Sequence, residues 1–180
     1  MKEVQFGELT FVPSITEEQI AAAVSRVANR INADYAGRKP MFMIVLNGAF
    51  MFAADLLRQV TLDCTVCCIK LSSYHGGLAS SGEVKELMGV DADLTGKDVI
   101  IVEDIVDTGL TMHGLIPQIK SRGAASVEVC AFVHKPEMLR YEDAKPKYIG
   151  LNIPNRFIIG YGLDVDGLAR NLPEVYELKA

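Results

Sequence analysis

Four short, strongly apolar runs constrain the fold of this chain more than any other feature. They occupy residues 41–46, 62–71, 99–102 and 126–134, and a fifth run at 157–164 predicts a further strand near the C-terminus. Runs of this length are typical of β-strands, and strands that are apolar on both faces are typical of parallel sheets. The chain is therefore expected to build a sheet that is covered on both sides.

Helical patterns lie between these runs. Thr16 and Gln19 have the spacing of a capping box, and a stripe of apolar residues follows until Gly37. Residues 49–60 predict a second helix, and a stripe that begins at Met112 and ends near Gly123 predicts a third. Strands that alternate with helices predict an α/β fold, with a mostly parallel twisted sheet, flanking helices and right-handed crossovers.

Length and charge restrict the classes of function. The 180 residues suit one domain, and the formal net charge of −5 without a basic run disfavours binding to a nucleic-acid backbone. The N-terminus lacks the apolar region of a signal peptide, and no segment approaches the roughly 18 apolar residues of a membrane span. We therefore expect a cytoplasmic protein with no nucleic-acid or membrane partner.

The cysteines give no sign of a metal or redox site. Cys64 and Cys67 have the CxxC spacing, but both lie in a predicted strand, where residues three apart point to opposite faces. Together with Cys68 and Cys130 they are expected to be reduced, buried thiols of a cytosolic protein.

The segment VIIVEDIVDTGLT, residues 99–111, places three carboxylates directly after a buried strand. A structural explanation covers only part of it: Asp107 or Thr108 caps the next helix and Gly109 gives a permissive backbone. Glu103 and Asp104 stay unexplained, because an unpaired charge beside a buried strand is costly.

The second half of this segment is suited to an anion. Residues 107–111 supply two hydroxyls, a glycine and the free N–H groups of a helix start, which together can hold one phosphate. Neither a Walker A loop nor a GxGxxG fingerprint occurs in the chain. A ribose with its phosphate in the loop and its diol on Glu103 and Asp104 would bring the two halves together, and Mg²⁺ would add a further link.

Other breaks fall where predicted strands end: residues 46–48, the loop after Leu71, and His134–Lys135. Ligands of open α/β sheets bind beyond the carboxyl ends of the strands. These breaks and the acidic segment are therefore expected to converge on one side of the sheet.

Residues 99–111 resemble the 5-phosphoribosyl-1-pyrophosphate (PRPP) motif of the type I phosphoribosyltransferases. Four further segments resemble motifs of the hypoxanthine-guanine branch of that family, in the same order and spacing. They are LNGAFMFAADLL, LSSYHGGLASSGEVK, HKPE and NRFIIGYGLDVDGLARNLP. The resemblance covers roughly residues 40–175.

The resemblance implies a purine salvage enzyme. It would transfer the 5-phosphoribosyl group from PRPP to hypoxanthine, and also to guanine, with Mg²⁺ as cofactor and a homodimer or homotetramer as its assembly. The products would be IMP or GMP and pyrophosphate. It also implies one domain over residues 1–180, with a core at about 38–150, a small hood from about 1–15 and 151–180, and a flexible catalytic loop at about 72–87.

The resemblance assigns the PRPP site. Glu103 and Asp104 would hold the ribose hydroxyls and the metal, Asp107 would be the general base near purine N7, and residues 108–111 would take the 5′-phosphate. The other residues implied for PRPP, pyrophosphate or catalysis are Leu46, Asn47, Gly48, Ser73, Tyr74, Thr108, Gly109, Leu110, Thr111 and Arg170.

The resemblance also assigns the purine site. Lys135 would meet the oxygen at purine position 6, Phe157 would stack on the base, and Ile158 would contact it through its backbone. Asp164 would be a second metal ligand beside the base. Without the resemblance, a surface lysine after a strand is the alternative interpretation of Lys135, and an aromatic at the head of a strand, such as Phe157, is more often a core residue.

One departure concerns the pyrophosphate loop. Asn47 stands where many family members have lysine, and Ala49 replaces a common glycine or serine. The family has a non-proline cis peptide bond before the lysine position, so the loop is expected to act mainly through its backbone N–H groups. The missing cation puts the strength of pyrophosphate binding in question.

Two alternatives stay open from the sequence. The first is a regulatory protein that keeps this fold and binds PRPP or nucleotides. The second is a relative directed to xanthine or to a pyrimidine. The sequence does not rank hypoxanthine, guanine and xanthine, because groups near purine C2 are contacted largely by backbone.

Overall fold

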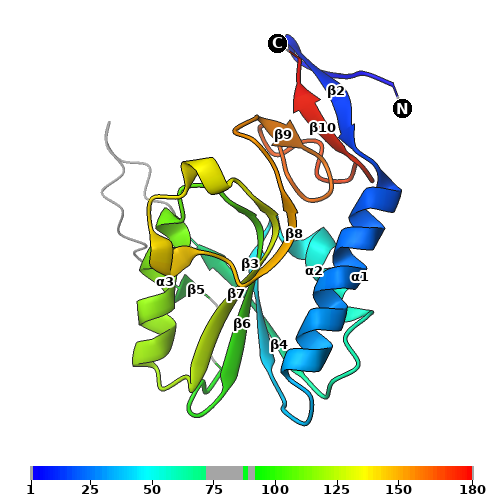
Figure 1. The fold of residues 1–180 in the computed structure, drawn as a ribbon. Helices are drawn as coiled ribbons and strands as arrows, with labels where there is room; N and C mark the ends of the chain where they lie inside the picture. The colour runs from blue at the N-terminus through cyan, green and yellow to red at the C-terminus, as the bar shows by residue number, and fades with distance from the viewer. Residues whose placement is uncertain (1, 72–86, 89–91, 180) are drawn as a thin grey trace.

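A computed structural model describes residues 2–71, 87–88 and 92–179, and shows two sheets stacked end to end (Figure 1). The larger, six-stranded sheet has the order β5-β4-β3-β6-β7-β8, and the smaller, four-stranded sheet has the order β1-β2-β10-β9. The strands of the larger sheet are β3 (Met41–Leu46), β4 (Thr65–Leu71), β5 (Leu87–Met88), β6 (Asp98–Val106), β7 (Ser126–His134) and β8 (Tyr148–Asn152).

The larger sheet is parallel except for its edge strand β5. Strand β3 pairs in parallel with β4 and β6, β6 with β7, and β7 with β8. Only β5, which pairs with β4, runs the other way. The predicted fold class is confirmed, because a mostly parallel sheet lies between helices.

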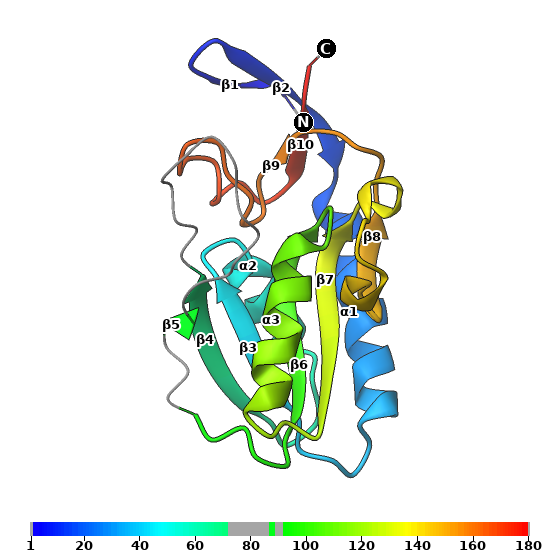
Figure 2. The same cartoon turned by 90° about the vertical axis from the view of Figure 1, so that its left-hand side faces the viewer.

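Helices cover both faces of this sheet (Figures 1 and 2). Helices α1 (Glu17–Asp34) and α2 (Phe50–Leu57) lie on one face, and α3 (Leu110–Ser121) lies on the other. The first face packs residues such as Phe42, Ile100 and Phe132 against α1 and α2, and the second packs Ile101 and Val129 against α3. The burial of these apolar side chains is the main favourable contribution to folding.

Helix α1 starts as the sequence predicts. The side chain of Thr16 accepts from the backbone N–H of Gln19 at 3.2 Å, and the Gln19 side chain accepts from the Thr16 N–H at 2.9 Å. This reciprocal pair is the capping box, and it satisfies two N–H groups that a helix start leaves free.

The smaller sheet, which we call the hood, joins the two ends of the chain. It consists of β1 (Val4–Phe6), β2 (Leu9–Ile15), β9 (Ile158–Ile159) and β10 (Val175–Leu178), all antiparallel. A small core of its own includes Phe11, Ile159 and Tyr176. The domain limits inferred from the resemblance stay a prediction.

Several elements differ from the sequence prediction. The strand predicted at 157–164 is only two residues long, because Gly160, Tyr161 and Gly162 all have positive φ angles and the chain turns there. Strand β8 completes the parallel sheet although it was not predicted. Helix α2 ends at Leu57, before the predicted Val60.

The cysteines also differ in part. All four are free, as expected, but Cys68 is exposed and only Cys130 is fully buried. Cys64 precedes β4, which starts at Thr65. Cys68 is exposed because neither α1 nor α2, the helices on its face of the sheet, covers this part of β4.

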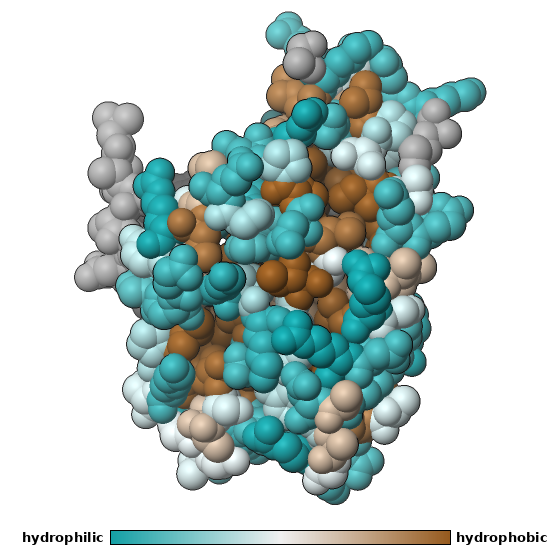
Figure 3. Space-filling model, in the orientation of Figure 1, coloured by the Kyte–Doolittle hydropathy of each residue, from teal (hydrophilic) through white to brown (hydrophobic). Residues whose placement is uncertain are grey.

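The face in Figure 3 is mostly hydrophilic, and apolar residues show through in separate patches, one of them where the hood meets the core. None of the helices in the described part of the chain is both long and apolar enough to cross a membrane.

Candidate active site

The carboxyl ends of β3, β6 and β7 meet at one edge of the parallel sheet, below the hood (Figure 1). The chain segments that follow these strands hold most of the predicted site residues. Of the four expected breaks, three converge there, as the contacts below show. The loop after Leu71, with Ser73 and Tyr74, lies outside the described residues.

Glu103 and Asp104 lie within β6 and not after it, since the strand continues to Val106. Glu103 is 8% exposed, and its Oε1 accepts from the Asp104 backbone N–H at 3.2 Å. Burial first, and then the charge of Asp104, raise the pKa of Glu103 well above its ordinary value. Two adjacent acids in a buried strand therefore carry an electrostatic cost.

The loop after β3 lies against Asp104. The peptide bond between Leu46 and Asn47 is cis, as the resemblance implied. A Cβ atom on Gly48 would collide with the carboxylate of Asp104. A side chain at position 48 would have to displace this carboxylate, so the loop backbone and an acid of β6 share one small space.

A second backbone segment closes on the same loop. A Cβ atom on Gly162 would collide with the carbonyl oxygen of Gly48. Arg170 donates from Nη1 to the Gly162 carbonyl at 2.6 Å and pairs through Nη2 with Asp164 at 2.6 Å. The structure thus brings Gly48, Asp104, Asp164 and Arg170 into one neighbourhood, as expected.

Asp107 and Lys135 form the next part of the edge. Lys135 is 7% exposed, which rules out the alternative of a surface lysine. Its Nζ lies 3.7 Å from Asp107 Oδ2 and 3.4 Å from Asn155 Oδ1. The other carboxylate oxygen of Asp107, Oδ1, is buried and has no hydrogen-bond partner among the described residues. An orphaned buried acceptor is costly, and a ligand that donates to it removes that cost.

The start of α3 lies within the predicted phosphate loop. Gly109 is its N-cap with a φ of 82°, and no side chain caps the helix there. Asp107 is therefore not a cap, although Thr108 Oγ1 accepts from the Leu110 N–H at 3.3 Å. The first N–H groups of a helix lack intrahelical acceptors, so the N–H groups of Gly109 and Thr111 offer donors to an anion, whereas the Leu110 N–H is held by Thr108.

Phe157 stands apart from the core. It is 48% exposed, and its ring centroid lies 5.9 Å from that of Phe11 at an angle of 46°. Ile158 is buried and pairs with Glu177 in the hood sheet. An exposed aromatic ring held at its base by another ring is suited to stack on a flat ligand.

The predicted metal ligands fit a cation that uses ligand oxygens as well. Among the described residues, no three His, Cys, Asp or Glu side chains converge into a ready metal site. Mg²⁺ is usually held by one or two carboxylates plus phosphate oxygens of the substrate, so it needs no such cage. The close acids Glu103 and Asp104, and Asp164 nearby, have the hard oxygen donors that this ion requires.

Sequence reasoning missed two contributors to this site. Gly162 is needed for the contact with Gly48, and Asn155 holds the amine of Lys135. The glycines on either side of Tyr161 were a signal, because an apolar strand seldom contains two of them. Asn155 opens the segment NRFIIGYGLDVDGLARNLP, but no local pattern shows its contact with Lys135, 20 residues away.

Known proteins match nearly the whole chain. A model of the phosphoribosyl transferase domain matches residues 13–166. The chain is 43% identical over 164 residues to a hypoxanthine-guanine phosphoribosyltransferase of Streptococcus agalactiae, covering 91% of each chain. A crystal structure of a hypoxanthine-guanine phosphoribosyltransferase from Bacillus anthracis is similar with a TM-score of 0.83 and 36% identity, over 93% of this chain and 97% of that one. A hypoxanthine phosphoribosyltransferase of Trypanosoma cruzi gives 0.86 and 35%, over 99% and 95%.

The raised pKa of Glu103 leads to a prediction for stability. In the folded state Glu103 holds its proton to higher pH than in the unfolded chain, so this residue lowers the free energy of unfolding as the pH rises. In metal-free buffer, Glu103→Gln is therefore expected to be more stable than the wild type at neutral pH. The gain should shrink as the pH falls toward the ordinary pKa of glutamate.

Urea unfolding at several pH values measures this difference. Glu137→Gln, which changes an exposed carboxyl, is the matched control and should show no such trend. A stability difference between Glu103→Gln and wild type that stays constant with pH would contradict the prediction.

Proposed function

The chain belongs to the phosphoribosyl transferase family, and from this premise we propose that it transfers the 5-phosphoribosyl group of PRPP to hypoxanthine and guanine. The products are IMP or GMP and pyrophosphate. The free thiols of all four cysteines agree with a cytoplasmic enzyme of purine salvage.

The observation that carries the choice of base is the pairing of Asp107 with the buried Lys135. A buried ammonium group that faces a ligand space donates to an acceptor and repels a donor. The oxygen at position 6 of hypoxanthine and guanine is an acceptor, whereas adenine presents an amino group there. Lys135 therefore favours a 6-oxopurine.

Asp107 has the chemistry of a general base toward the same ligand. Its orphaned Oδ1 is a free acceptor, and Lys135 Nζ lies 3.7 Å from Oδ2. In the proposed reaction this oxygen takes a hydrogen bond or a proton at purine N7. Phe157, exposed at the hood, stacks on the ring.

The sugar and its phosphate lie along β6 and α3 in this proposal. Glu103 and Asp104 accept from the ribose hydroxyls and place negative charge near the anomeric carbon, where positive charge develops as the bond to pyrophosphate breaks. The N–H groups and hydroxyls of residues 108–111 hold the 5′-phosphate. Gly48 and Arg170 lie on the side where the leaving pyrophosphate is held.

Mg²⁺ is proposed as the cofactor, held by Glu103, Asp104 and Asp164 together with substrate oxygens. When bound, it would neutralise the charge of the diphosphate. The acidic residues would supply the oxygens, and Arg170, which pairs with Asp164, would supply a cation for the diphosphate.

A turnover assay tests this function. Purified protein with PRPP and Mg²⁺ is offered hypoxanthine, guanine, xanthine and adenine in separate reactions and in competition, and product nucleotides are separated by chromatography. We expect IMP and GMP and little AMP. An absence of product with every 6-oxopurine would sink the proposal, and binding of RNA or DNA in its place would favour the regulatory alternative.

Asp107→Asn tests the general base. The amide cannot take a proton, so kcat is expected to fall by about 100-fold or more while the fold is kept. Asp166→Asn, at an exposed turn residue whose φ of 51° asparagine tolerates, is the matched control. Steady-state kinetics and circular dichroism measure both variants. A fall below about threefold would remove Asp107 from this role.

Lys135→Ala tests the contact with position 6 of the purine. We expect the KM for hypoxanthine to rise by about tenfold or more, since a charged hydrogen bond is lost, while the KM for PRPP changes much less. Lys145→Ala, at an exposed lysine of the same segment, should leave both constants unchanged. The opposite split would place Lys135 in the PRPP site.

A homo-oligomer is proposed through the uncovered side of β4 and the neighbouring helix α2. Val66 is 49% exposed and Phe50 is 42% exposed, and Cys68 is exposed as well. Val66 and Cys68 pair in register with Phe42 and Ile44, which belong to the cluster that packs against α1 and α2, so Val66 and Cys68 lie on the face of the sheet that carries these helices. Apolar residues gathered at one surface of a folded chain are typical of an interface.

Val66→Glu tests this interface. A buried charge would weaken association, so sedimentation velocity should show more monomer at equal concentration than for the wild type. Leu9→Glu, at an exposed apolar residue of the hood, is the control and should not change the assembly. A wild type that is monomeric at micromolar concentration would contradict the proposal.

A further inference from the structure

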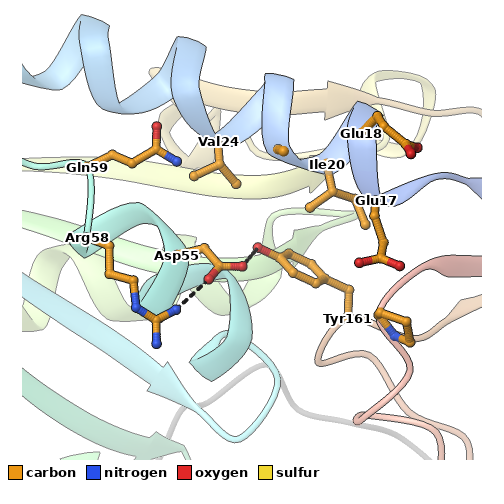
Figure 4. Close-up of a pocket in the computed structure, with 10 residues that line it drawn as sticks. Glu17, Glu18, Ile20, Val24, Asp55, Arg58, Gln59 and Tyr161 are labelled. Carbon is orange, nitrogen blue, oxygen red and sulfur yellow. Dashed lines mark hydrogen bonds and ion pairs between the residues drawn. The ribbon is translucent and has the colours of Figure 1, made fainter.

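A hydrogen bond between a buried tyrosine and an aspartate connects two segments of the site, helix α2 and residues 160–164. The Tyr161 hydroxyl donates to Asp55 Oδ2 at 2.8 Å, and Arg58 holds the other oxygen of Asp55 at 2.8 Å (Figure 4). The bond lies at a pocket of about 490 Å³ between α1, the end of α2 and Pro173. Tyr161 is only 4% exposed.

Each end of this bond belongs to a segment that binds ligand in the proposed function. Asp55 lies on α2, which begins directly after the loop of residues 46–48. Tyr161 lies directly before Gly162, whose carbonyl accepts from Arg170. The two segments touch where Gly162 packs on the carbonyl of Gly48. The hydrogen bond therefore joins the elements that carry this contact.

The conformation of Tyr161 depends on its surroundings. Its φ of 50° is in the left-handed region, which L-residues with large side chains rarely adopt. The ring packs against Phe132 with centroids 4.8 Å apart, and the hydroxyl is held by Asp55. Burial raises the pKa of Tyr161, so the hydroxyl keeps its proton and remains a donor.

We propose that Tyr161 and Asp55 are positioning residues for the pyrophosphate half of the site. Their hydrogen bond holds residues 160–164 against the loop of residues 46–48, so that the loop backbone and Arg170 meet the diphosphate of PRPP together. Neither side chain touches the substrate. This inference rests on the proposed function for its kinetic consequence, although the structural link itself does not.

The chain contains a matched control. The Tyr148 hydroxyl donates to Asp34 Oδ2, also at 2.8 Å, and Tyr148 is fully buried. This bond joins β8 to the end of α1, so both of its partners lie on elements other than the 46–48 loop and residues 160–164. Tyr148→Phe thus removes the same chemical group at a site where only stability should change.

Kinetics separate positioning from stability. For Tyr161→Phe we expect the KM for PRPP and the inhibition constant of pyrophosphate to rise by about fivefold or more, with the KM for hypoxanthine changed by less than about twofold. Asp55→Ala should behave in the same way. Asp55→Asn keeps an acceptor for the tyrosine and should stay close to wild type. Tyr148→Phe should leave all three constants unchanged.

Equal constants for Tyr161→Phe and Tyr148→Phe, in an active wild type, would overturn the inference. So would a parallel rise in the KM of both substrates, because that pattern indicates general damage and not a fault in one half of the site.

Hydrogen exchange gives a second test that does not need turnover. In ligand-free protein, Tyr161→Phe should speed amide exchange in residues 44–52 and 158–164 relative to wild type, and Tyr148→Phe should not. Unchanged exchange in both segments would overturn the inference even if the enzyme is active. Faster exchange in an enzyme that fails to use PRPP would support the structural link and count only against the proposed function.

Discussion

The site depends on one close approach of backbone to backbone and carboxylate. Gly48 lies between the Asp104 carboxylate and Gly162, with no room for a Cβ atom at either glycine. Because the parallel strands bring their carboxyl ends to one edge, a short loop from β3 reaches the acids of β6 without leaving the sheet. The hood then adds the 160–170 segment from the other end of the chain. Three distant parts of the sequence therefore meet in a space that is open because two glycines, Gly48 and Gly162, have no side chain.

Charge in this site is arranged in pairs, with one exception. Asp107 faces Lys135, and Asp164 faces Arg170, so these four groups partly neutralise one another when no ligand is present. Glu103 and Asp104 have no cation among the pairs described. Burial and the neighbouring charge of Asp104 raise the pKa of Glu103, so it holds its proton more tightly. The two ion pairs hold their side chains in place with little uncompensated charge. Glu103 and Asp104 carry negative charge that no cation among these pairs balances, and the hydroxyls of a sugar diol or a divalent cation are suited to interact with it.

The sequence predicted the parts of the fold that local pattern determines. The apolar runs became β3, β4, β6 and β7, and the capping box starts α1. The length of strand β9 was overestimated, because the whole segment FIIGYGLD is apolar enough for a strand. The positive φ angles at its glycines and at Tyr161, which end the strand, depend on packing against distant segments. In the same way, the family motifs identified Asp107, Lys135 and Arg170 as candidate site residues. No local signal shows that Arg170 pairs with Asp164 or that Asn155 holds Lys135. Contacts between residues far apart in sequence are what the pattern leaves out.

The ion pair between Asp164 and Arg170 has a thermodynamic consequence. In the proposed reaction Arg170 binds the anionic diphosphate and Asp164 binds a metal cation. The diphosphate must therefore compete with Asp164 for the arginine, and the cation must compete with Arg170 for the aspartate. Under the proposed function, whichever ligand binds first would weaken this pair and leave the other side chain more available to the second ligand. Linkage requires this help to be equal in both directions. The proposed anion and cation would then each strengthen the binding of the other, and this salt bridge would contribute to that coupling.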